Sequence, residues 1–125
     1  MSILNHVTLG TNDKEKAAAF YDAALGALGI NNMGPMGDKG IMYGIDKPEF
    51  LITIPRDGNQ ACHANGGTVG FVAPSREAIN EFHAKGLANG GTCEGEPGPR
   101  DFVPGCYGAY LRDPDGNKIC AYHFA

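Results

Sequence analysis

An internal repeat at a spacing of 62 residues constrains this 125-residue chain more than any other feature of its sequence. Residues 6–29 align without a gap on residues 68–91. The identical pairs are Val7 with Val69, Glu15 with Glu77, Phe20 with Phe82, Leu25 with Leu87, and Gly29 with Gly91. Neither copy is long enough to bury a sheet face alone. The repeat and the mass of 13.1 kDa therefore predict a single domain over 1–125, with one module over about 1–58 and another over about 65–125.

Each copy predicts a short strand followed by an amphipathic helix, because apolar residues recur at the spacing of helical turns. The first apolar set is Ala17, Phe20, Tyr21, Ala24, Leu25 and Leu28, and the second is Ile79, Phe82, His83, Gly86 and Leu87. Strands are predicted at 3–10, 40–45, 50–55, 67–73, 106–112 and 118–124. The Pro- and Gly-rich run 94–104 and the linking segment 56–67 are predicted to be surface loops.

Charge and cysteine content exclude several classes of protein. The net charge is −4 and the charged residues are scattered, so neither nucleic acid nor an anionic membrane is an expected partner. No apolar run approaches the ~20 residues of a membrane span, and the first residues show no secretion signal, which predicts a cytoplasmic protein. The cysteines Cys62, Cys93, Cys106 and Cys120 lack CxxC spacing and are expected to be reduced thiols.

Three segments carry a resemblance to a known superfamily. They are the opening run Asn5-His6-Val7-Thr8-Leu9-Gly10-Thr11-Asn12-Asp13, the helix segment Phe20-Tyr21-Asp22 with Leu25, and the closing turn Asp113-Pro114-Asp115-Gly116-Asn117-Lys118-Ile119. Together they resemble the vicinal oxygen chelate superfamily, which includes glyoxalase I, bleomycin-resistance proteins and extradiol dioxygenases. The resemblance implies an α+β fold in which two tandem βαβββ modules form a curled mixed sheet around a cleft, with the helices on the outside. It also implies a homodimer.

The resemblance further implies where a divalent metal would be held in the cleft. It places the family's ligands at His6, at Thr68, at Leu51 or Ile52, and at Cys120. Metal-dependent relatives usually carry His or Gln at the first two positions and Glu at the last two. Here only His6 keeps a donor of that kind, although the Cys120 thiol could hold zinc as a thiolate. The site is therefore predicted to be degenerate, with His6 and Cys120 as ligands if a metal is present.

Strand alternation predicts which side chains face the cleft. The helix-facing residues are expected to be Val7, Leu9, Val69, Phe71, Ile119 and Ala121. The ligand-binding candidates are His6, Thr68, Arg100, Tyr107, Cys120 and Tyr122. Arg100 is among them because a guanidinium can bind a carboxylate or a phosphate through two hydrogen bonds. The remaining imidazoles, His63, His83 and His123, are interpreted as structural or solvated side chains.

These observations favour a metal-independent protein that binds a small organic molecule, an anion if Arg100 contacts it. The alternative is a metal-dependent lyase or isomerase of the lactoylglutathione lyase (glyoxalase I) type, or a related dioxygenase, with zinc, nickel or manganese in the cleft. The missing carboxylates favour the binding protein, whereas His6 and Cys120 support the enzyme. The sequence shows no nucleophile motif, phosphate-binding glycine loop or dinucleotide fingerprint, so no catalytic residue is assigned.

Overall fold

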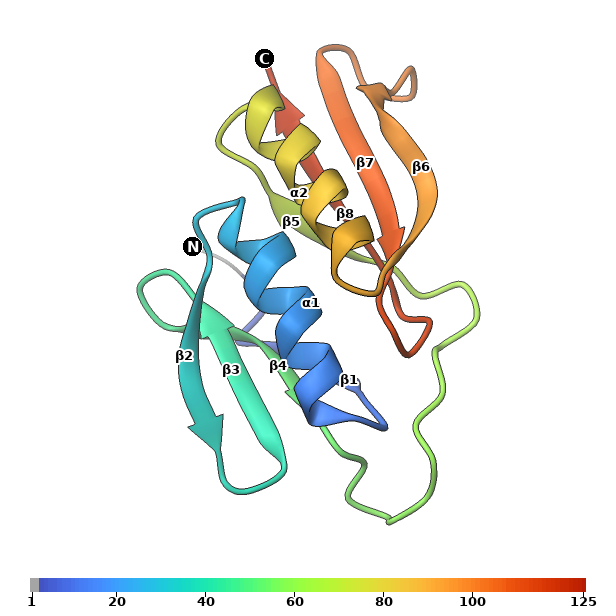
Figure 1. Cartoon of the computed structure of the whole chain (residues 1–125). Helices are drawn as coiled ribbons and strands as arrows, with labels where there is room; N and C mark the ends of the chain where they lie inside the picture. Colours follow the sequence, from blue (N-terminus) through green and yellow to red (C-terminus); the bar gives the residue numbers. More distant parts are fainter. Residues whose placement is uncertain (1–2) are drawn as a thin grey trace.

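The computed structural model describes residues 3–125 and contains two helices and eight strands. The first half holds β1 (Val7–Gly10), α1 (Lys14–Gly26), β2 (Asn31–Met36), β3 (Gly40–Gly44) and β4 (Pro48–Thr53). The second half holds β5 (Val69–Val72), α2 (Arg76–Ala88), β6 (Thr92–Pro99), β7 (Cys106–Arg112) and β8 (Lys118–Phe124). The predicted α+β class is confirmed, and so are the two tandem modules with the same order of elements (Figure 1).

The strands form two separate four-stranded sheets, in the orders β1-β4-β3-β2 and β5-β8-β7-β6. In each sheet the first strand of the module pairs in parallel with the last strand, and the other pairs are antiparallel. Both sheets are open, so β1 and β2 are the edges of one sheet and β5 and β6 the edges of the other. The two halves are therefore equivalent in topology, as the sequence repeat predicts.

Both helices begin at a side chain that caps them. Asp13 accepts a hydrogen bond from the backbone N–H of Lys16, and Ser75 accepts one from Ala78, each at 3.1 Å. Capping of this kind satisfies a backbone donor that the first helical turn leaves free. Within residues 3–125, neither helix is both long enough and apolar enough to cross a bilayer.

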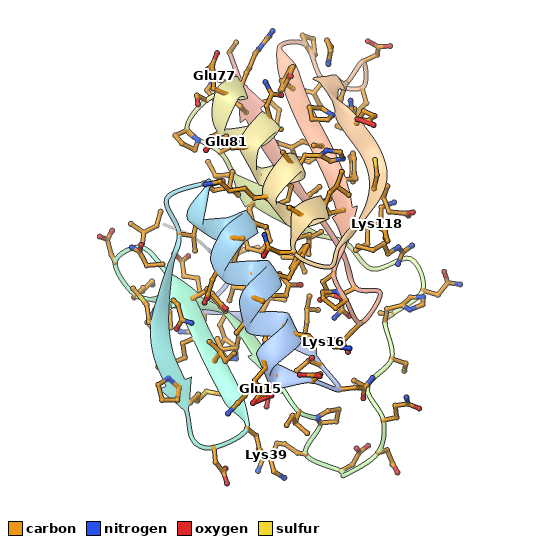
Figure 2. The ribbon with its side chains drawn as sticks, viewed as in Figure 1. Glu15, Lys16, Lys39, Glu77, Glu81 and Lys118 are labelled. Atoms are coloured by element: carbon orange, nitrogen blue, oxygen red, sulfur yellow. The ribbon has the colours of Figure 1, made fainter. Side chains whose placement is uncertain are left out.

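One hydrophobic core joins the two modules. Helix α1 lies over the first sheet and α2 over the second, and the two helices lie side by side (Figure 1). At the junction the rings of Phe50 and Phe71 meet edge to face, with centroids 5.0 Å apart. The charged side chains labelled on the helices, Glu15, Lys16, Glu77 and Glu81, are exposed (Figure 2). Burial of the apolar helix faces thus holds the two halves together.

A buried carboxylate ties the last turn of the chain to the first helix. Asp113 accepts hydrogen bonds from the Tyr21 hydroxyl at 2.6 Å and from the backbone N–H groups of Asp115 and Asn117, each at 2.9 Å. The Asn117 amide in turn donates to the carbonyl of Gly10 at 3.0 Å. Burial raises the pKa of Asp113, and burial together with the nearby Asp113 charge raises the pKa of Tyr21. The closing turn therefore helps to fix the second module against the first.

Strand β6 corrects the prediction that 94–104 is a surface loop throughout. Its residues 92–99 pair with β7, although prolines and glycines disfavour strands. Register shifts between Cys93 and Gly95 and between Gly95 and Gly98 absorb extra residues. Strand β6 is at the edge of its sheet, so the backbone N–H groups on its outer side pair with no other strand of the described part of the chain. Proline, which lacks an N–H group, is therefore tolerated at such positions. Strand β2 likewise has no alternating pattern that would have predicted it.

Candidate functional site

The faces of the sheets follow the predicted alternation. The core-facing set includes Leu9, Val69, Phe71, Ile119 and Ala121. Because successive residues of a strand point to opposite faces, Gly70 and its partner Cys120 lie on the outer face of the second sheet. In the first sheet Thr8 and its partner Leu51 hold the corresponding places. The residues expected around a metal are therefore distributed over the outer faces of two sheets.

The structure does not bring the expected metal-ligand positions together. Leu51 and Cys120 lie on inner strands of different sheets, and both side chains point away from the shared core. His6 is exposed, with its Nδ1 2.7 Å from the side-chain oxygen of the preceding residue. Thr68 is exposed and lines a different pocket from His6, and Ile52 is fully buried in the core. A leucine without a donor and a neutral hydroxyl do not fit a divalent metal.

Cys120 lies in a tyrosine-rich patch on the outer face of the second sheet. Its neighbours Tyr110 and Tyr122 are hydrogen-bonded to each other through their hydroxyls. Burial raises the pKa of the Cys120 thiol, and a hydrogen bond with Tyr122 opposes that shift only in part. A Cβ at Gly108 would lie 2.6 Å from the Tyr122 ring, so the tyrosine depends on this glycine for its place. Among the described residues Cys120 belongs to no group of His, Cys, Asp and Glu donors close enough to share an ion, so it does not restore the metal site.

Arg100 is engaged by the protein itself. Its guanidinium carbon lies 5.4 Å from the centroid of the Tyr110 ring, an arrangement typical of a cation–π contact. The guanidinium donates to the backbone carbonyls of Glu96 at 2.7 Å and of Gly98 at 3.0 Å. These hydrogen bonds fold the end of β6 around the arginine and occupy part of the donors that could bind an anion.

Tyr107 faces α2 and not the tyrosine-rich patch around Cys120, which corrects its expected place in the cleft. Its hydroxyl donates to the side-chain oxygen of Asn80 at 2.7 Å, and the Arg76 guanidinium lies 5.0 Å from its ring centroid. The physical reason is register: β7 pairs Tyr107 with His123, which has the core-facing parity of β8. Tyr107 is therefore on the opposite face of the sheet from Cys120 and Tyr122.

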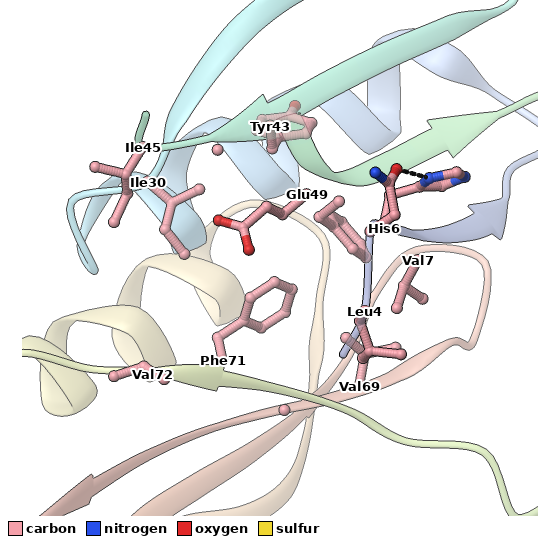
Figure 3. Close-up of a pocket in the computed structure, with 14 residues that line it drawn as sticks. Leu4, His6, Val7, Ile30, Tyr43, Ile45, Glu49, Val69, Phe71 and Val72 are labelled. Atoms are coloured by element: carbon pink, nitrogen blue, oxygen red, sulfur yellow. Dashed lines mark hydrogen bonds between the residues drawn. The ribbon is translucent and has the colours of Figure 1, made fainter. Parts of the chain in front are cut away.

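A pocket of about 250 Å³ opens between the two modules (Figure 3). We call it the inter-module pocket; its apolar lining includes Leu4, Ile30, Tyr43, Phe50, Val69 and Phe71. A carboxylate and an imidazole also line it: Glu49 points its carboxylate into the space, and His6 lies at the side (Figure 3). Of the six predicted cleft residues, His6 is the one that lines this pocket. Glu49 was not predicted, because in the sequence an acidic residue at the start of a strand looks like any other surface carboxylate.

The other histidines have separate surroundings. His63 is exposed, and the ring of His123 lies 3.1 Å from the carbonyl oxygen of Ala73. His83 is buried on α2, and its Nε2 lies 3.1 Å from the Cys93 Sγ of strand β6. Burial lowers the pKa of His83, and nearby Glu96 partly opposes that shift. The predicted structural role therefore fits His123, whereas His83 contacts Cys93, another side chain that can bind a metal.

The combination of two βαβββ modules with this closing turn matches a known family. The family model described as the glyoxalase/bleomycin resistance protein/dioxygenase superfamily matches residues 3–121. The chain belongs to this superfamily. Its members share the architecture described above, so the family assignment agrees with the fold while leaving the chemistry of the site to the residues.

Solved members of the glyoxalase/bleomycin resistance protein/dioxygenase superfamily extend the comparison. A glyoxalase/bleomycin resistance protein from Albidiferax ferrireducens T118 is 51% identical, with 98% of each chain covered and a TM-score of 0.88. A lactoylglutathione lyase from Agrobacterium tumefaciens is 19% identical, covering 98% of this chain and 94% of that one, with a TM-score of 0.67. A glyoxalase-related enzyme from Fulvimarina pelagi is 16% identical over 98% and 88%, with a TM-score of 0.75. The last two show the fold alone. No curated protein gives a significant match.

Proposed function

We propose that this superfamily member is a metal-independent binding protein for a small organic molecule, and that the molecule occupies the inter-module pocket. The observation that carries the proposal is the contrast between two places in the molecule. The pocket offers about 250 Å³ of largely apolar space. The positions expected to hold a metal offer one exposed histidine, a threonine, a leucine and a buried thiol, which the structure does not bring together.

The size and lining of the pocket define the class of ligand. Pockets for drug-sized ligands measure roughly 300–1,000 Å³, so a space of about 250 Å³ suits a molecule about as large as one substituted ring. The aromatic rings of Tyr43, Phe50 and Phe71 favour a flat apolar body. The Glu49 carboxylate favours a positive charge or a hydrogen-bond donor on that body, and it disfavours an anion. Arg100, the basis for expecting an anion, does not line this pocket.

We therefore expect the protein to bind benzylamine more tightly than benzoate, a probe of the same ring size and the opposite charge. Nuclear magnetic resonance titration should shift the backbone amides of Phe50 and of residues 69–72. Replacing Glu49→Gln should weaken benzylamine binding by roughly two- to fivefold, the usual range for a partly exposed charge pair. The aromatic lining stays in place in this variant, so benzoate binding should strengthen or stay constant.

Glu81→Gln is the matched control, since Glu81 is an exposed carboxylate on α2 that pairs with Lys85 at 3.8 Å. This variant should bind benzylamine like the parent protein. The proposal would be contradicted if the amide shifts mapped to the tyrosine-rich patch around Tyr110 and Tyr122. It would also be contradicted if the parent and Glu49→Gln each bound the two probes equally.

We also propose that two copies pair and that pairing covers the mouth of the inter-module pocket. Leu4, Ile45 and Val72 line the pocket while remaining 59%, 58% and 85% exposed, which is unusual for large apolar side chains. The edge strands β1 and β5 also border this pocket, and within residues 3–125 each pairs on one side only, with β4 and with β8. A second copy would bury these side chains and shield the strand edges.

Light scattering at micromolar concentration is expected to give about twice the chain mass of 13.1 kDa. Val72→Asp places a charge among the exposed apolar side chains that pairing would bury, so it should shift the mass toward that of one chain. Lys39→Asp, a charge change at an exposed site on the β2–β3 turn, should leave the mass unchanged. A parent protein that scatters as a single chain at this concentration would refute the pairing.

A further inference from the structure

We propose that His83, Cys93 and Glu96 form a zinc site between α2 and β6, separate from the inter-module pocket and from the positions where the family resemblance implied a metal. His83 comes from the middle of the helix, and the other two residues come from the edge strand packed beside it. The three side chains supply a nitrogen, a sulfur and an oxygen. The proposal goes beyond the proposed function, because a bound ligand in the inter-module pocket neither requires nor excludes this site.

The donor atoms already lie close enough to share one ion. The Nε2 of His83 is 3.1 Å from the Sγ of Cys93, and the ligand atoms of all three residues lie within 4.8 Å of one another. Zinc binds sulfur at about 2.3 Å and nitrogen or oxygen at about 2.0–2.2 Å, which places its ligand atoms roughly 3–4 Å apart in a tetrahedron. Small side-chain rotations of the two exposed residues are therefore enough to complete the geometry.

A bulge in β6 explains how Cys93 and Glu96 come to face the same ion. In a regular strand, residues three apart point to opposite faces of the sheet. Here β6 pairs Cys93 with Leu111 and Gly95 with Tyr110, so one additional residue, Glu94, is inserted between them. Leu111 is a core-facing residue, and a second register shift follows between Gly95 and Gly98. Within this irregular part of β6 the donor atoms of Cys93 and Glu96 lie within 4.8 Å of each other and of the His83 ring nitrogen. The edge strand is thus bent so that a thiol and a carboxylate both point toward α2.

The charges around the cluster leave the Glu96 carboxylate available. The ion pairs formed within the described residues are Glu81 with Lys85 and Glu94 with Arg112, and neither uses Glu96. Arg100 contacts Glu96 through the backbone carbonyl, at 2.7 Å. A divalent cation would balance this carboxylate together with the Cys93 thiolate.

The position of His83 in the repeat sets this cluster apart from ordinary core packing. Its counterpart in the first module is Tyr21, a fully buried side chain whose hydroxyl is bound to Asp113. His83 is only 4% exposed, and its Nε2 contacts a side chain that can act as a metal ligand. A buried histidine rigidly held by its helix is a suitable anchor, while Cys93 and Glu96 are exposed and open to an incoming ion.

The donor set selects the metal. A thiolate, an imidazole and a carboxylate together suit zinc, a borderline ion, whereas magnesium and calcium prefer oxygen ligands alone. Three protein ligands also leave one tetrahedral position to water or to a small external ligand.

The test is calorimetric titration of the reduced, metal-free chain of residues 1–125 with zinc, supported by cobalt absorption spectra. We expect one zinc per chain and, with cobalt, a thiolate-to-metal charge-transfer band that only a bound cysteine produces. Cys93→Ser and Glu96→Gln change exposed side chains, so both variants should fold. Each should weaken zinc binding at least tenfold, since even outer-sphere changes cost roughly 10–100-fold at zinc sites.

Three variants serve as controls. Cys62→Ser removes the other exposed thiol, Glu94→Gln changes the neighbouring carboxylate, and His6→Ala removes the histidine of the family position; all three should bind zinc like the parent. Absence of stoichiometric zinc, or Cys93→Ser binding as tightly as the parent, would overturn the site. Loss of zinc in His6→Ala would also overturn it and would favour the metal-dependent lyase alternative. Benzylamine binding is measured separately, so failure of either proposal is visible independently of the other.

Discussion

Replacing Asp113 with alanine is expected to lower the free energy of unfolding by about 3–4 kcal/mol. The carboxylate is 4% exposed and accepts hydrogen bonds from a tyrosine hydroxyl, an asparagine amide and two backbone N–H groups. Removing it leaves the Tyr21 hydroxyl and the turn donors buried without an acceptor. Because Asn117 also donates to Gly10 in the first module, loss of this turn weakens the junction between the modules as well.

Urea denaturation followed by circular dichroism measures this effect, and thermal unfolding should show a decrease in Tm of roughly 10–20 °C. Asp46→Ala is the matched control, because Asp46 is an exposed aspartate in the turn between β3 and β4. It should change stability by no more than about 0.5 kcal/mol. If Asp113→Ala were as stable as Asp46→Ala, the buried hydrogen-bond network would not contribute as described.

A second large effect is expected for Gly86→Ala, a substitution that would stabilise most helices. The added Cβ would lie 2.5 Å from the Leu111 Cδ1 and 3.2 Å from the Phe20 Cε1, and both of those side chains are fully buried. Overpacking of this kind costs roughly 1–3 kcal/mol, whereas the gain in helix propensity is at most about 1 kcal/mol. The net result should be a loss of about 1–2 kcal/mol, because the close approach of α2 to the core has no room for a methyl group.

Gly26→Ala provides the comparison, since Gly26 is also helical and a Cβ there would have no neighbour within 4 Å. This substitution should raise the free energy of unfolding by a few tenths of a kcal/mol, up to about 1 kcal/mol. Denaturation midpoints that move in opposite directions for the two variants would support the packing argument. A rise in stability for both would show that α2 can shift away from Phe20 without cost.

The sequence predicts the architecture well because the repeat and the periodicity report on burial. The residues of α1 that form its apolar stripe, such as Phe20 and Leu25, are fully buried. Strand parity likewise identifies the opposite faces of Phe71 and Cys120. Strand β6 could not be predicted in this way, because pairing with β7 and not its Pro- and Gly-rich sequence makes it a strand.

The candidate site was less predictable, because a site depends on convergence and not on residue type alone. His6 lines the inter-module pocket as one side chain among many, and Glu49 lies beside it without any pattern that marks it. The contact of His83 with Cys93 depends on the packing of a helix against a bulged strand. Alternation predicts the face of a regular strand, but it fails after a bulge whose position only the register reveals.

The separation of the strands into two sheets has a consequence for the order in which the chain acquires its structure. Every ladder within residues 3–125 joins strands of the same module, so all strand partners of the first sheet emerge during synthesis before the second half has left the ribosome. Each module must first close a loop spanning most of its length, because β1 pairs with β4 and β5 with β8. The nascent first module therefore presents Phe50 to solvent until Phe71 arrives to cover it.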